Sequence, residues 1–427
     1  MAPAASNSNA EGYQTRLTFI NELLTERYHI KVTKIQPVAY EADFPFPYNN
    51  FVYLVEAQIQ ADTFQRIGTQ YGTEPVPTDA SQFIVRLPNP VSGYNDQVRV
   101  ENEVASLALG RAALLRNDGT NLVARVFAWG SAKGGHQGWI VQEYMPGQPL
   151  AQDFEAMELD KQKIILGQMA DVIGALQRFD VPESIKQYGG LTYTTDGSMV
   201  SSAMSILDGG PFQTYAELVL GTIRSKLTKA DKNSHIAGWH ANGVRDRLET
   251  FLMDGYPGLM RTATATDKRL VHADLSTDNL LYDKTTLKVT ALIDFDFAHI
   301  ATVADEFFRS LGFGIGTFPD PMEGKEAATL NDAMLNGFPE PLPAATDEIK
   351  WPQAKAWDDA LHDRGLYRPS TIPGLTTLSE LFWLSSQLLP FKLVHPVVVG
   401  NSSEEQLSDR RADGEKLLTE FLSKHGY

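Results

Sequence analysis

The chain has 427 residues, 37 of them basic and 53 acidic, and its formal net charge of −16 argues against a sequence-independent nucleic-acid binder. It contains no cysteine, which excludes disulfides, zinc thiolate sites and thiol catalysis. The opening residues, MAPAASNSNAEGYQ, lack the basic and apolar regions of a secretory signal, and no apolar run approaches the roughly 18 residues that span a bilayer, so we expect a cytoplasmic protein without a membrane partner.

The first third of the chain predicts a β-rich unit. After a tail that we expect to be disordered over residues 1–12, apolar residues recur at helical spacing from Tyr13 to Tyr28. The runs IKVTKIQPVAY, NFVYLVEAQI and QFIVRLP predict strands, and Val100 and Val104 mark an amphipathic helix after them. LVARVFAWGSA and WIVQEYM, joined by the turn KGGHQG, predict a β-hairpin. We therefore expect about five strands, with one helix inserted after the third.

The character of the sequence changes after the turn PGQPL. The periodicity predicts a long helix from Leu159 to Phe179, and residues 181–268 mix short strands, glycine-rich turns and two helical stretches. Two short strands joined by the turn DKTTLK come next, and the remainder has the pattern of helices separated by proline-rich loops. The sequence thus predicts an α+β protein with domains over residues 13–145 and 146–427.

The stretch RLVHADLSTDNLLYD, which begins at Arg269, carries ionisable groups in an otherwise apolar run. Buried carboxylates cost free energy unless something compensates them, and a metal ion is one such compensation. Residues His272 to Asn279 have the spacing H-x-D-L-x-x-x-N, which matches the kinase catalytic loop. Phosphoryl transfer needs a carboxylate to accept the proton of the attacking hydroxyl and an oxygen ligand to hold Mg²⁺, and Asp274 and Asn279 can fill these roles. The alternative is a polar loop whose side chains bond the backbone of a turn.

A second acidic stretch, VTALIDFDFAHI, follows the first. Asp294, at the end of its apolar strand, is placed to hold Mg²⁺ between the phosphates, and hard oxygen ligands suit this ion. Asp296 lies on the same side of an extended chain, where it either supports the magnesium ligands or caps the next segment. We expect a structural role for His272, because a histidine in such a loop usually packs against it and orients it.

These motifs resemble those of the aminoglycoside phosphotransferase and choline kinase-like family, which are small-molecule kinases built on the protein-kinase fold. The resemblance covers the chain from about Tyr13 to the last helix and is strongest in HADLSTDN and IDFDFA. It implies a bilobal protein-kinase-like fold, with a small β-rich N-terminal lobe and a large, mostly helical C-terminal lobe. It also implies ATP and Mg²⁺ between the lobes and a small-molecule hydroxyl as acceptor. Ala273 departs from the family, which usually has glycine at this place.

The resemblance implies a basic residue on the third strand that holds the α- and β-phosphates and pairs with a helix glutamate. In the strand FIVRL this residue is Arg86 rather than the usual lysine, and arginine differs from lysine in reach and geometry. Its expected partner is Glu103, which shares a helix face with Val100, whereas Glu101 points elsewhere. The alternative for Arg86 is a charge on the strand surface.

The nucleotide loop matches the family least well. Its sequence, FPFPYNNFVYLV, has no glycine to allow close backbone approach to phosphate, although Asn50 resembles a family asparagine at this place. The stretch IVQEYMPG resembles the family's hinge, where backbone groups of Glu143 and Met145 would contact adenine. The alternative is a plain strand end followed by a turn.

Two other functions compete with a small-molecule kinase. A protein kinase would need D-F-G, which is absent, and A-P-E, of which the only counterpart is F-P-E far downstream, ending at Glu340. A catalytically silent nucleotide-binding regulator is favoured by the glycine-free loop and Arg86, but opposed by the intact Asp274, Asn279 and Asp294. We favour an ATP- and Mg²⁺-dependent enzyme that moves the γ-phosphate to a small-molecule hydroxyl. Neither the acceptor nor the oligomeric state follows from the sequence.

Overall fold

Alternating apolar residues in the first third of the chain form one antiparallel sheet with the strand order β1-β2-β3-β5-β4. The computed structural model describes residues 9–38, 44–59, 67–263, 266–311, 315–346 and 349–427. The strands of this sheet are β1 (Lys31–Pro37), β2 (Asn50–Gln58), β3 (Gln82–Pro88), β4 (Val126–Gly130) and β5 (Trp139–Glu143). The five expected strands are confirmed, and α2 (Arg99–Ala113) follows the third of them as predicted.

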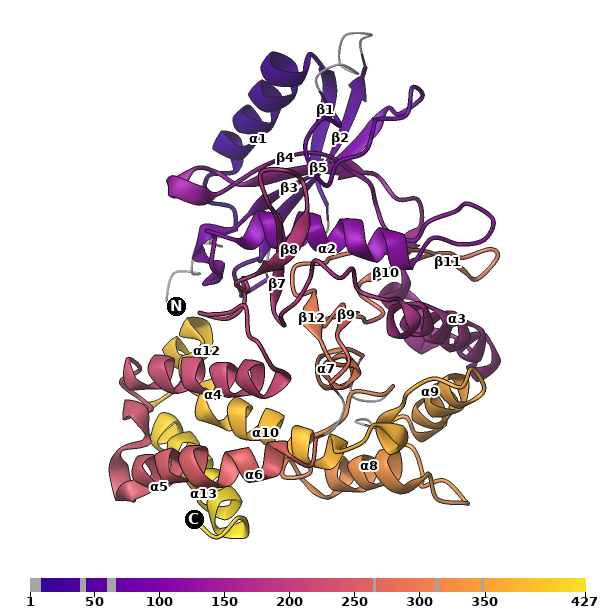
Figure 1. The fold of residues 1–427 in the computed structure, drawn as a ribbon. Helices are drawn as coiled ribbons and strands as arrows, with labels where there is room; N and C mark the ends of the chain where they lie inside the picture. Colours follow the sequence, from indigo (N-terminus) through magenta and orange to yellow (C-terminus); the bar gives the residue numbers. More distant parts are fainter. Residues whose placement is uncertain (1–8, 39–43, 60–66, 264–265, 312–314, 347–348) are drawn as a thin grey trace.

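The two faces of the sheet are covered by different helices (Figure 1). In β3, the side chains of Phe83 and Val85 belong to the buried cluster beneath α1 (Tyr13–Glu22). Successive residues of a strand point to opposite faces, so Arg86, which follows Val85, points toward α2 and its Glu103. The predicted helix at the start of the chain ends as an α-helix at Glu22 and continues as a single π-helical turn.

The remainder of the chain forms a mostly helical lobe below the sheet (Figure 1). Its short strands are β6 (Gln148–Pro149), β7 (Gly190–Tyr193), β8 (Met199–Ser202), β9 (Arg269–Val271), β10 (Leu280–Asp283), β11 (Lys288–Leu292) and β12 (His299–Ala301). Its helices are α3 (Leu159–Arg178), α4 (Tyr215–Asp231), α5 (Val244–Thr250), α6 (Tyr256–Met260), α7 (Val303–Arg309), α8 (Lys325–Asn336), α9 (Trp351–His362), α10 (Leu375–Leu388), α11 (Phe391–Val394), α12 (Pro396–Gly400) and α13 (Glu404–Lys424). The predicted bilobal α+β fold is therefore confirmed.

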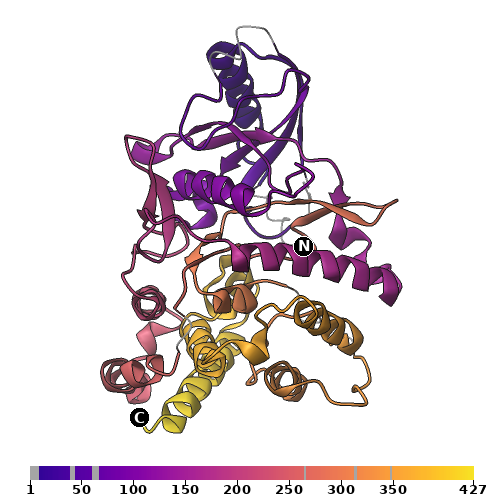
Figure 2. The ribbon, with the colours of Figure 1, turned by 45° about the vertical axis from the view of Figure 1, so that its right-hand side comes forward.

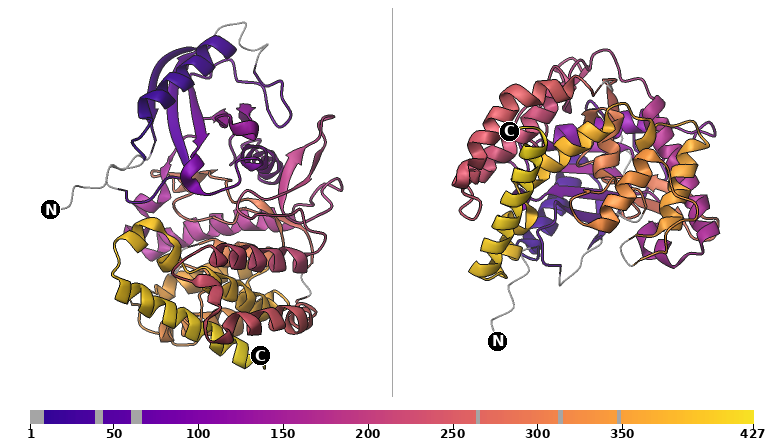
Figure 3. Two further views of the ribbon diagram at one scale, coloured as in Figure 1. Left: turned by 90° about the vertical axis from the view of Figure 1, so that its left-hand side faces the viewer. Right: turned by 90° about the horizontal axis from the view of Figure 1, so that it is seen from below.

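The elements of the C-terminal lobe fall into two groups. Helix α3 passes beneath the N-terminal lobe next to the hairpin β10–β11 (Figure 2). Helices α4 to α6 and the C-terminal helices α10 and α13 pack together at the base of the lobe and share a second apolar core (Figure 3). None of the described helices combines the length and the apolar character needed to cross a membrane.

The predicted tail over residues 1–12 falls mainly on residues 1–8, which lie outside the described residues. The next residue, Asn9, is buried, and its side chain bonds the loop between β1 and β2. The Asn9 Nδ2 donates to the carbonyl of Phe46 at 2.9 Å, and the amide of Tyr48 donates to Asn9 Oδ1 at 2.8 Å.

The hairpin β7–β8 fixes α2 to the C-terminal lobe (Figure 1). The buried side chain of Asn102 on α2 donates to the carbonyl of Leu191 at 2.9 Å and accepts from the amide of Ser205 at 3.0 Å. Asn102 thus bonds a donor and an acceptor of the other lobe with one side chain. This contact holds α2, which carries Glu103, in one position relative to the C-terminal lobe.

Replacing Asn102 tests how much this contact stabilises the protein. Asn102→Ala should lower the free energy of unfolding by about 2–6 kcal/mol, because it leaves two backbone groups without their partner, at about 1–3 kcal/mol each. Denaturant unfolding measures the change, with Asn117→Ala at an exposed position as the control. Equal stabilities of the two variants would contradict a bonding role for Asn102.

Candidate active site

The loop between β9 and β10 places Asp274 and Asn279 side by side. The Asn279 Nδ2 donates to both the carbonyl and the Oδ2 of Asp274, each at 2.8 Å. The Oδ1 of Asp274 has no hydrogen bond within the described residues and is open to a ligand. The side-chain oxygen of Asn279 is likewise left available, because only its nitrogen is used. The two residues that the sequence singles out therefore present two free oxygens at one place.

Helix α7 holds the backbone of this loop through Glu306. The amides of His272 and Ala273 donate to the two carboxylate oxygens of Glu306 at 2.8 and 3.1 Å, and the amide of Leu275 donates to Ser310 Oγ at 2.9 Å. Burial raises the pKa of Glu306, while the donated bonds oppose this rise. The sequence reasoning missed Glu306, although an acid inside the apolar run TVADEFF carries the same signal as the acids of the loop.

His272 connects the loop to the strand end that carries Asp294. It is fully buried, its Nε2 lies 3.1 Å from the carbonyl of Ile293, and its ring meets Phe295 edge-on at 4.7 Å. Burial lowers the pKa of His272 to about 4, so the ring is neutral near pH 7 and donates its Nε2 proton to the carbonyl. Helix α2 carries Gly110 opposite this ring. A Cβ at Gly110 would lie 2.5 Å from the ring of Phe295, so the lack of a side chain there leaves room for it. The position of His272 fits the expected structural role.

Arg86 lies between two carboxylates from different lobes. Its terminal nitrogen donates to Asp294 Oδ1 at 2.7 Å. Its Nε lies 2.8 Å from Glu103 Oε1, and this second contact is an ion pair whose geometry is not that of a hydrogen bond. Arg86 is 5% exposed and Glu103 is 2% exposed. Glu101 turns away from Arg86 and bonds Ser131 at 2.7 Å. Arg86 is thus a buried cation between the two lobes, and a strand-surface charge does not describe it.

The carboxylates of the site have different affinities for a proton. Burial alone would raise the pKa of Asp294, but the guanidinium of Arg86 outweighs it and holds this pKa below its usual value. Burial and the nearby charge of Asp294 raise the pKa of Asp274 to about 7. Near neutral pH the site therefore contains a fully ionised Asp294 and an Asp274 that can take up or release a proton.

Asp296 joins the lobes through a second buried ion pair. Its Oδ2 accepts from Arg99 and from Asn50, each at 2.8 Å, and its Oδ1 lies 3.3 Å from Arg99 Nε. The carboxylate of Asp296 is thus engaged by side chains of the N-terminal lobe rather than by the backbone of the next segment. Asn50, expected near the nucleotide, is 9% exposed, and its side chain contacts Asp296 and Arg99. The sequence reasoning did not identify Arg99, because its partners are distant in sequence.

The chain at the end of β5 carries the two residues expected to contact adenine. The amide of Glu143 is already bonded to the carbonyl of Arg125 at 2.9 Å, and its carboxylate pairs with the same arginine at 3.0 Å. The backbone of Met145, two residues on, has no backbone partner within the described residues. Of the two residues expected to contact adenine, Met145 is the one with an unbonded amide.

The oxygens around Asp294 suit a magnesium ion. Single carboxylate oxygens of Glu103, Asp294 and Asp296 lie within 4.8 Å of one another. Glu103 and Asp296 are engaged by arginines, so the donors left for a metal are the second oxygen of Asp294 and the side-chain oxygen of Asn279. Mg²⁺ takes few protein ligands and keeps several waters, so this donor set fits the ion.

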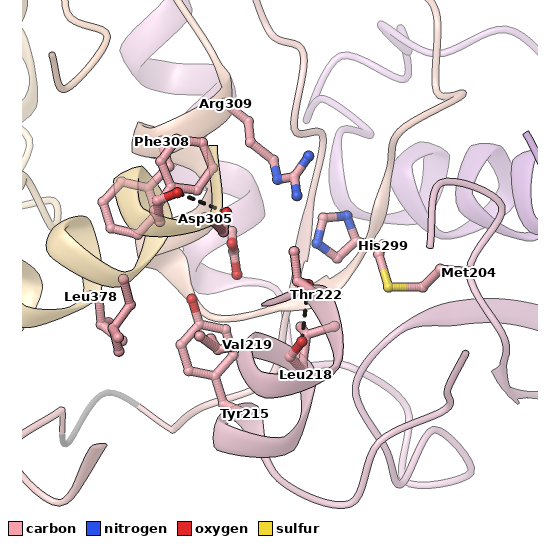
Figure 4. A pocket seen from close by; sticks show the side chains of 13 residues that line it. Met204, Tyr215, Leu218, Val219, Thr222, His299, Asp305, Phe308, Arg309 and Leu378 are labelled. Carbon is pink, nitrogen blue, oxygen red and sulfur yellow. Dashed lines mark hydrogen bonds between the residues drawn. The ribbon is translucent and has the colours of Figure 1, made fainter. Parts of the chain in front are cut away.

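A second face of α7 lines a small polar cavity (Figure 4). Asp305 and Arg309 on α7 face Tyr215 on α4 and His299 on β12. Asp305 is 8% exposed, and its Oδ2 has no hydrogen-bond partner within the described residues. The free volume of about 40 Å³ is far below that of a pocket for a drug-sized ligand. The cavity lies next to the helix that holds the loop between β9 and β10.

Comparison with known proteins supports one family. Residues 57–341, about two thirds of the chain, match the model of the phosphotransferase enzyme family. A comparison with curated protein sequences gives no match.

Solved structures similar to the chain include the Plasmodium vivax ethanolamine kinase, at 12% identity and a TM-score of 0.47, with 97% of this chain and 91% of that chain covered. A thermostable mutant of the aminoglycoside phosphotransferase APH(4)-Ia, in a ternary complex with AMP-PNP and hygromycin B, is 13% identical with a TM-score of 0.47 and coverages of 96% and 99%. ADP-bound aminoglycoside phosphotransferase APH(2'')-Ib is 13% identical with a TM-score of 0.47 and coverages of 95% and 98%.

The coupling between Arg86 and Glu103 can be measured as stability. Arg86→Ala should lower the free energy of unfolding by about 3–5 kcal/mol, because it leaves a buried carboxylate without its cation. The double variant Arg86→Ala/Glu103→Ala should lose less than the sum of the two single variants, because neither partner is then left alone. Denaturant unfolding of all four proteins gives the coupling free energy. Additive losses would mean that the two side chains do not interact.

Proposed function

The chain belongs to the phosphotransferase enzyme family, and from this membership and the geometry of its site we propose that it is an ATP- and Mg²⁺-dependent kinase of a small-molecule hydroxyl. One observation carries the proposal. Asp274, with one free oxygen and a pKa raised to about 7, lies beside an ionised Asp294 that Arg86 ties to the N-terminal lobe. This arrangement supports Asp274 as the proton acceptor, Asp294 as a metal ligand and Arg86 as the phosphate-binding cation.

Asp274 is the proposed general base. The free Oδ1 of Asp274 accepts the proton of the acceptor hydroxyl as that oxygen forms its bond to the γ-phosphorus of ATP. The bond between this phosphorus and the β–γ bridging oxygen breaks, and ADP leaves with the electron pair. Asn279 holds the other oxygen of Asp274 through its Nδ2, which leaves Oδ1 as the one that faces the reaction.

Asp294 and Asn279 are the proposed magnesium ligands. When bound there, the ion supplies positive charge against the phosphate oxygens, which lowers the cost of the charge that develops during transfer. Arg86 adds a fixed positive charge on the α- and β-phosphate side, and Glu103 limits the freedom of its guanidinium. The amide of Met145 is the proposed contact for adenine.

The alternative is a catalytically silent nucleotide-binding regulator. The observation that favours it is the glycine-free loop between β1 and β2, whose backbone is already bonded by Asn9. A regulator would bind ATP without turnover, so replacing Asp274 could change only the affinity for the nucleotide. Turnover that depends on Asp274 separates the two functions.

A screen of a metabolite library for ATP-dependent phosphorylation tests the proposed function. Asp274→Asn is nearly isosteric, so it should keep the fold and nucleotide affinity while turnover of any acceptor found falls by about 10²–10⁴. Phosphate transfer is measured by mass spectrometry of the products. Retention of most turnover in Asp274→Asn would remove this residue from the role of base.

The pKa of Asp274 predicts the pH dependence of the enzyme. A base must be ionised, so kcat/KM should fall about tenfold per pH unit below about pH 7 and level off above it. Because the charge of Asp278 also raises this pKa, Asp278→Asn should move the midpoint to lower pH without abolishing activity. The profile is measured with the acceptor from the screen. A profile that is flat through neutral pH would contradict the assignment.

A further inference from the structure

Gln142 is the residue of β5 directly before Glu143, at the end of the strand where the base of the nucleotide is proposed to bind. Ile84 lies opposite Gln142 in the sheet, and Arg86 is two residues further along β3. Cross-strand partners, and residues two apart on one strand, project from the same face of a sheet. This face is turned toward the C-terminal lobe, because Arg86 bonds Asp294 there. Gln142 therefore projects from the same face as the proposed phosphate-binding cation.

The amide of Gln142 is buried and makes no hydrogen bond. The residue is 7% exposed, and neither end of its amide has a partner within the described residues. Water does not replace that partner at Oε1, because this oxygen has essentially no surface open to solvent. A buried polar group without a partner costs free energy that an apolar side chain of similar size would not cost. Packing against the chain itself thus does not account for a glutamine at this position.

An apolar surface lies next to this amide. Ile84 and its cross-strand partner Leu54 of β2 project from the same face, and both are partly exposed. Val85 and Val55, the residues that follow them, project from the other face and are fully buried. Binding sites for small molecules are typically apolar, with a few polar groups that fix the orientation of the ligand. A partly exposed apolar surface beside a hydrogen-bonding amide suits a flat ring with a polar edge, such as a purine.

The edge of the base that meets the chain carries the C6 substituent. The Met145 amide, the proposed contact for adenine, donates to a ring nitrogen at the edge away from the ribose, and C6 belongs to that edge. We propose that the Gln142 amide forms a hydrogen bond with the C6 substituent of the purine, an inference that rests on the proposed function. Gln142 then determines which nucleotides are used, and Asp274 and the metal ligands carry the transfer itself.

A glutamine amide suits both common purines. Its carbonyl oxygen accepts, its NH₂ group donates, and a half-turn about the bond to the amide carbon exchanges the two. With the oxygen toward the base, the amide accepts from the amino group of adenine. With the nitrogen toward the base, it donates to the carbonyl oxygen of guanine. No hydrogen bond within the described residues holds the amide of Gln142 in one of these orientations, so we expect the protein to use both ATP and GTP.

Titration calorimetry in the presence of Mg²⁺ tests this contact without knowledge of the acceptor. The ligands are ADP, GDP and the 5′-diphosphate of purine riboside, which has hydrogen in place of the amino group at C6. Gln142→Met keeps the length of the side chain and removes its amide, and Gln142→Leu is a second apolar replacement. Gln162→Met is the matched control, because Gln162 on α3 is 1% exposed and its Oε1 also lacks a partner within the described residues.

The ligands separate a contact with the base from a structural role. The parent should bind ADP and GDP with affinities within about tenfold of each other, and the purine riboside analogue about two- to tenfold more weakly than ADP. Gln142→Met should weaken binding of ADP and GDP by about two- to tenfold and leave that of the analogue unchanged, because the lost bond needs a group at C6. Gln162→Met should bind all three ligands as the parent does. The midpoint of denaturant unfolding should not fall in Gln142→Met, because the variant removes a buried polar group that has no partner.

Other outcomes overturn the inference in distinguishable ways. If Gln142→Met and Gln142→Leu bind ADP as the parent does, the amide does not touch the base. If they weaken ADP and the analogue equally, Gln142 only shapes the surface on which the base lies. If the parent binds GDP more than about tenfold more weakly than ADP, the amide does not serve both purines. If the parent itself does not bind ADP with Mg²⁺, the proposed function fails and this inference fails with it.

Discussion

The arrangement of the site depends on Arg86, a buried cation shared by carboxylates from two lobes. It pairs with Glu103 of α2 and donates to Asp294 of the C-terminal lobe. Because ions in a protein interior are costly unless they are paired, each partner constrains the others to one geometry. The position of α2 is fixed independently by Asn102 and the hairpin β7–β8, so the distance that Arg86 spans is also set by contacts outside the site.

The loop that carries the proposed base Asp274 is oriented by buried contacts with Glu306 and His272. Glu306 accepts hydrogen bonds from two successive amides of the loop. The ring of His272 bonds the carbonyl of Ile293, the residue before Asp294. One of the two amides bonded by Glu306 belongs to Ala273, whose φ of +61° is uncommon for a residue other than glycine. Left-handed backbone costs about 1–2 kcal/mol for such a residue, and the two bonds to Glu306 offset that cost. The departure from the family's glycine is therefore compatible with the loop that the motif predicts.

Local patterns in the sequence predicted much of the fold, because strand alternation and helical periodicity act over short distances. They placed the five strands and α2, and the loop spacing brought Asp274 and Asn279 together. The ion pair of Arg99 with Asp296 and the hydrogen bonds of Glu306 to the loop join residues that are far apart in the sequence, so local patterns do not predict them. Arg99 and Glu306 could have been noticed only as charged residues in apolar runs, and the sequence does not say which residues they pair with. The role of Asn50 between the lobes was equally hidden, since a strand pattern does not reveal what lies opposite its first residue.

The glycine-free loop between β1 and β2 has another source of order. Glycine lets a backbone approach phosphate closely, but a flexible loop must lose conformational entropy when it is ordered by a ligand. Here the side chain of Asn9 bonds the backbone at Phe46 and Tyr48. The ring of Phe46 packs on two rings of the C-terminal lobe, with centroid distances of 4.6 Å to His395 and 5.8 Å to Phe391. The described part of this loop, residues 44–49, is therefore held from two sides, by Asn9 and by the aromatic rings of the C-terminal lobe.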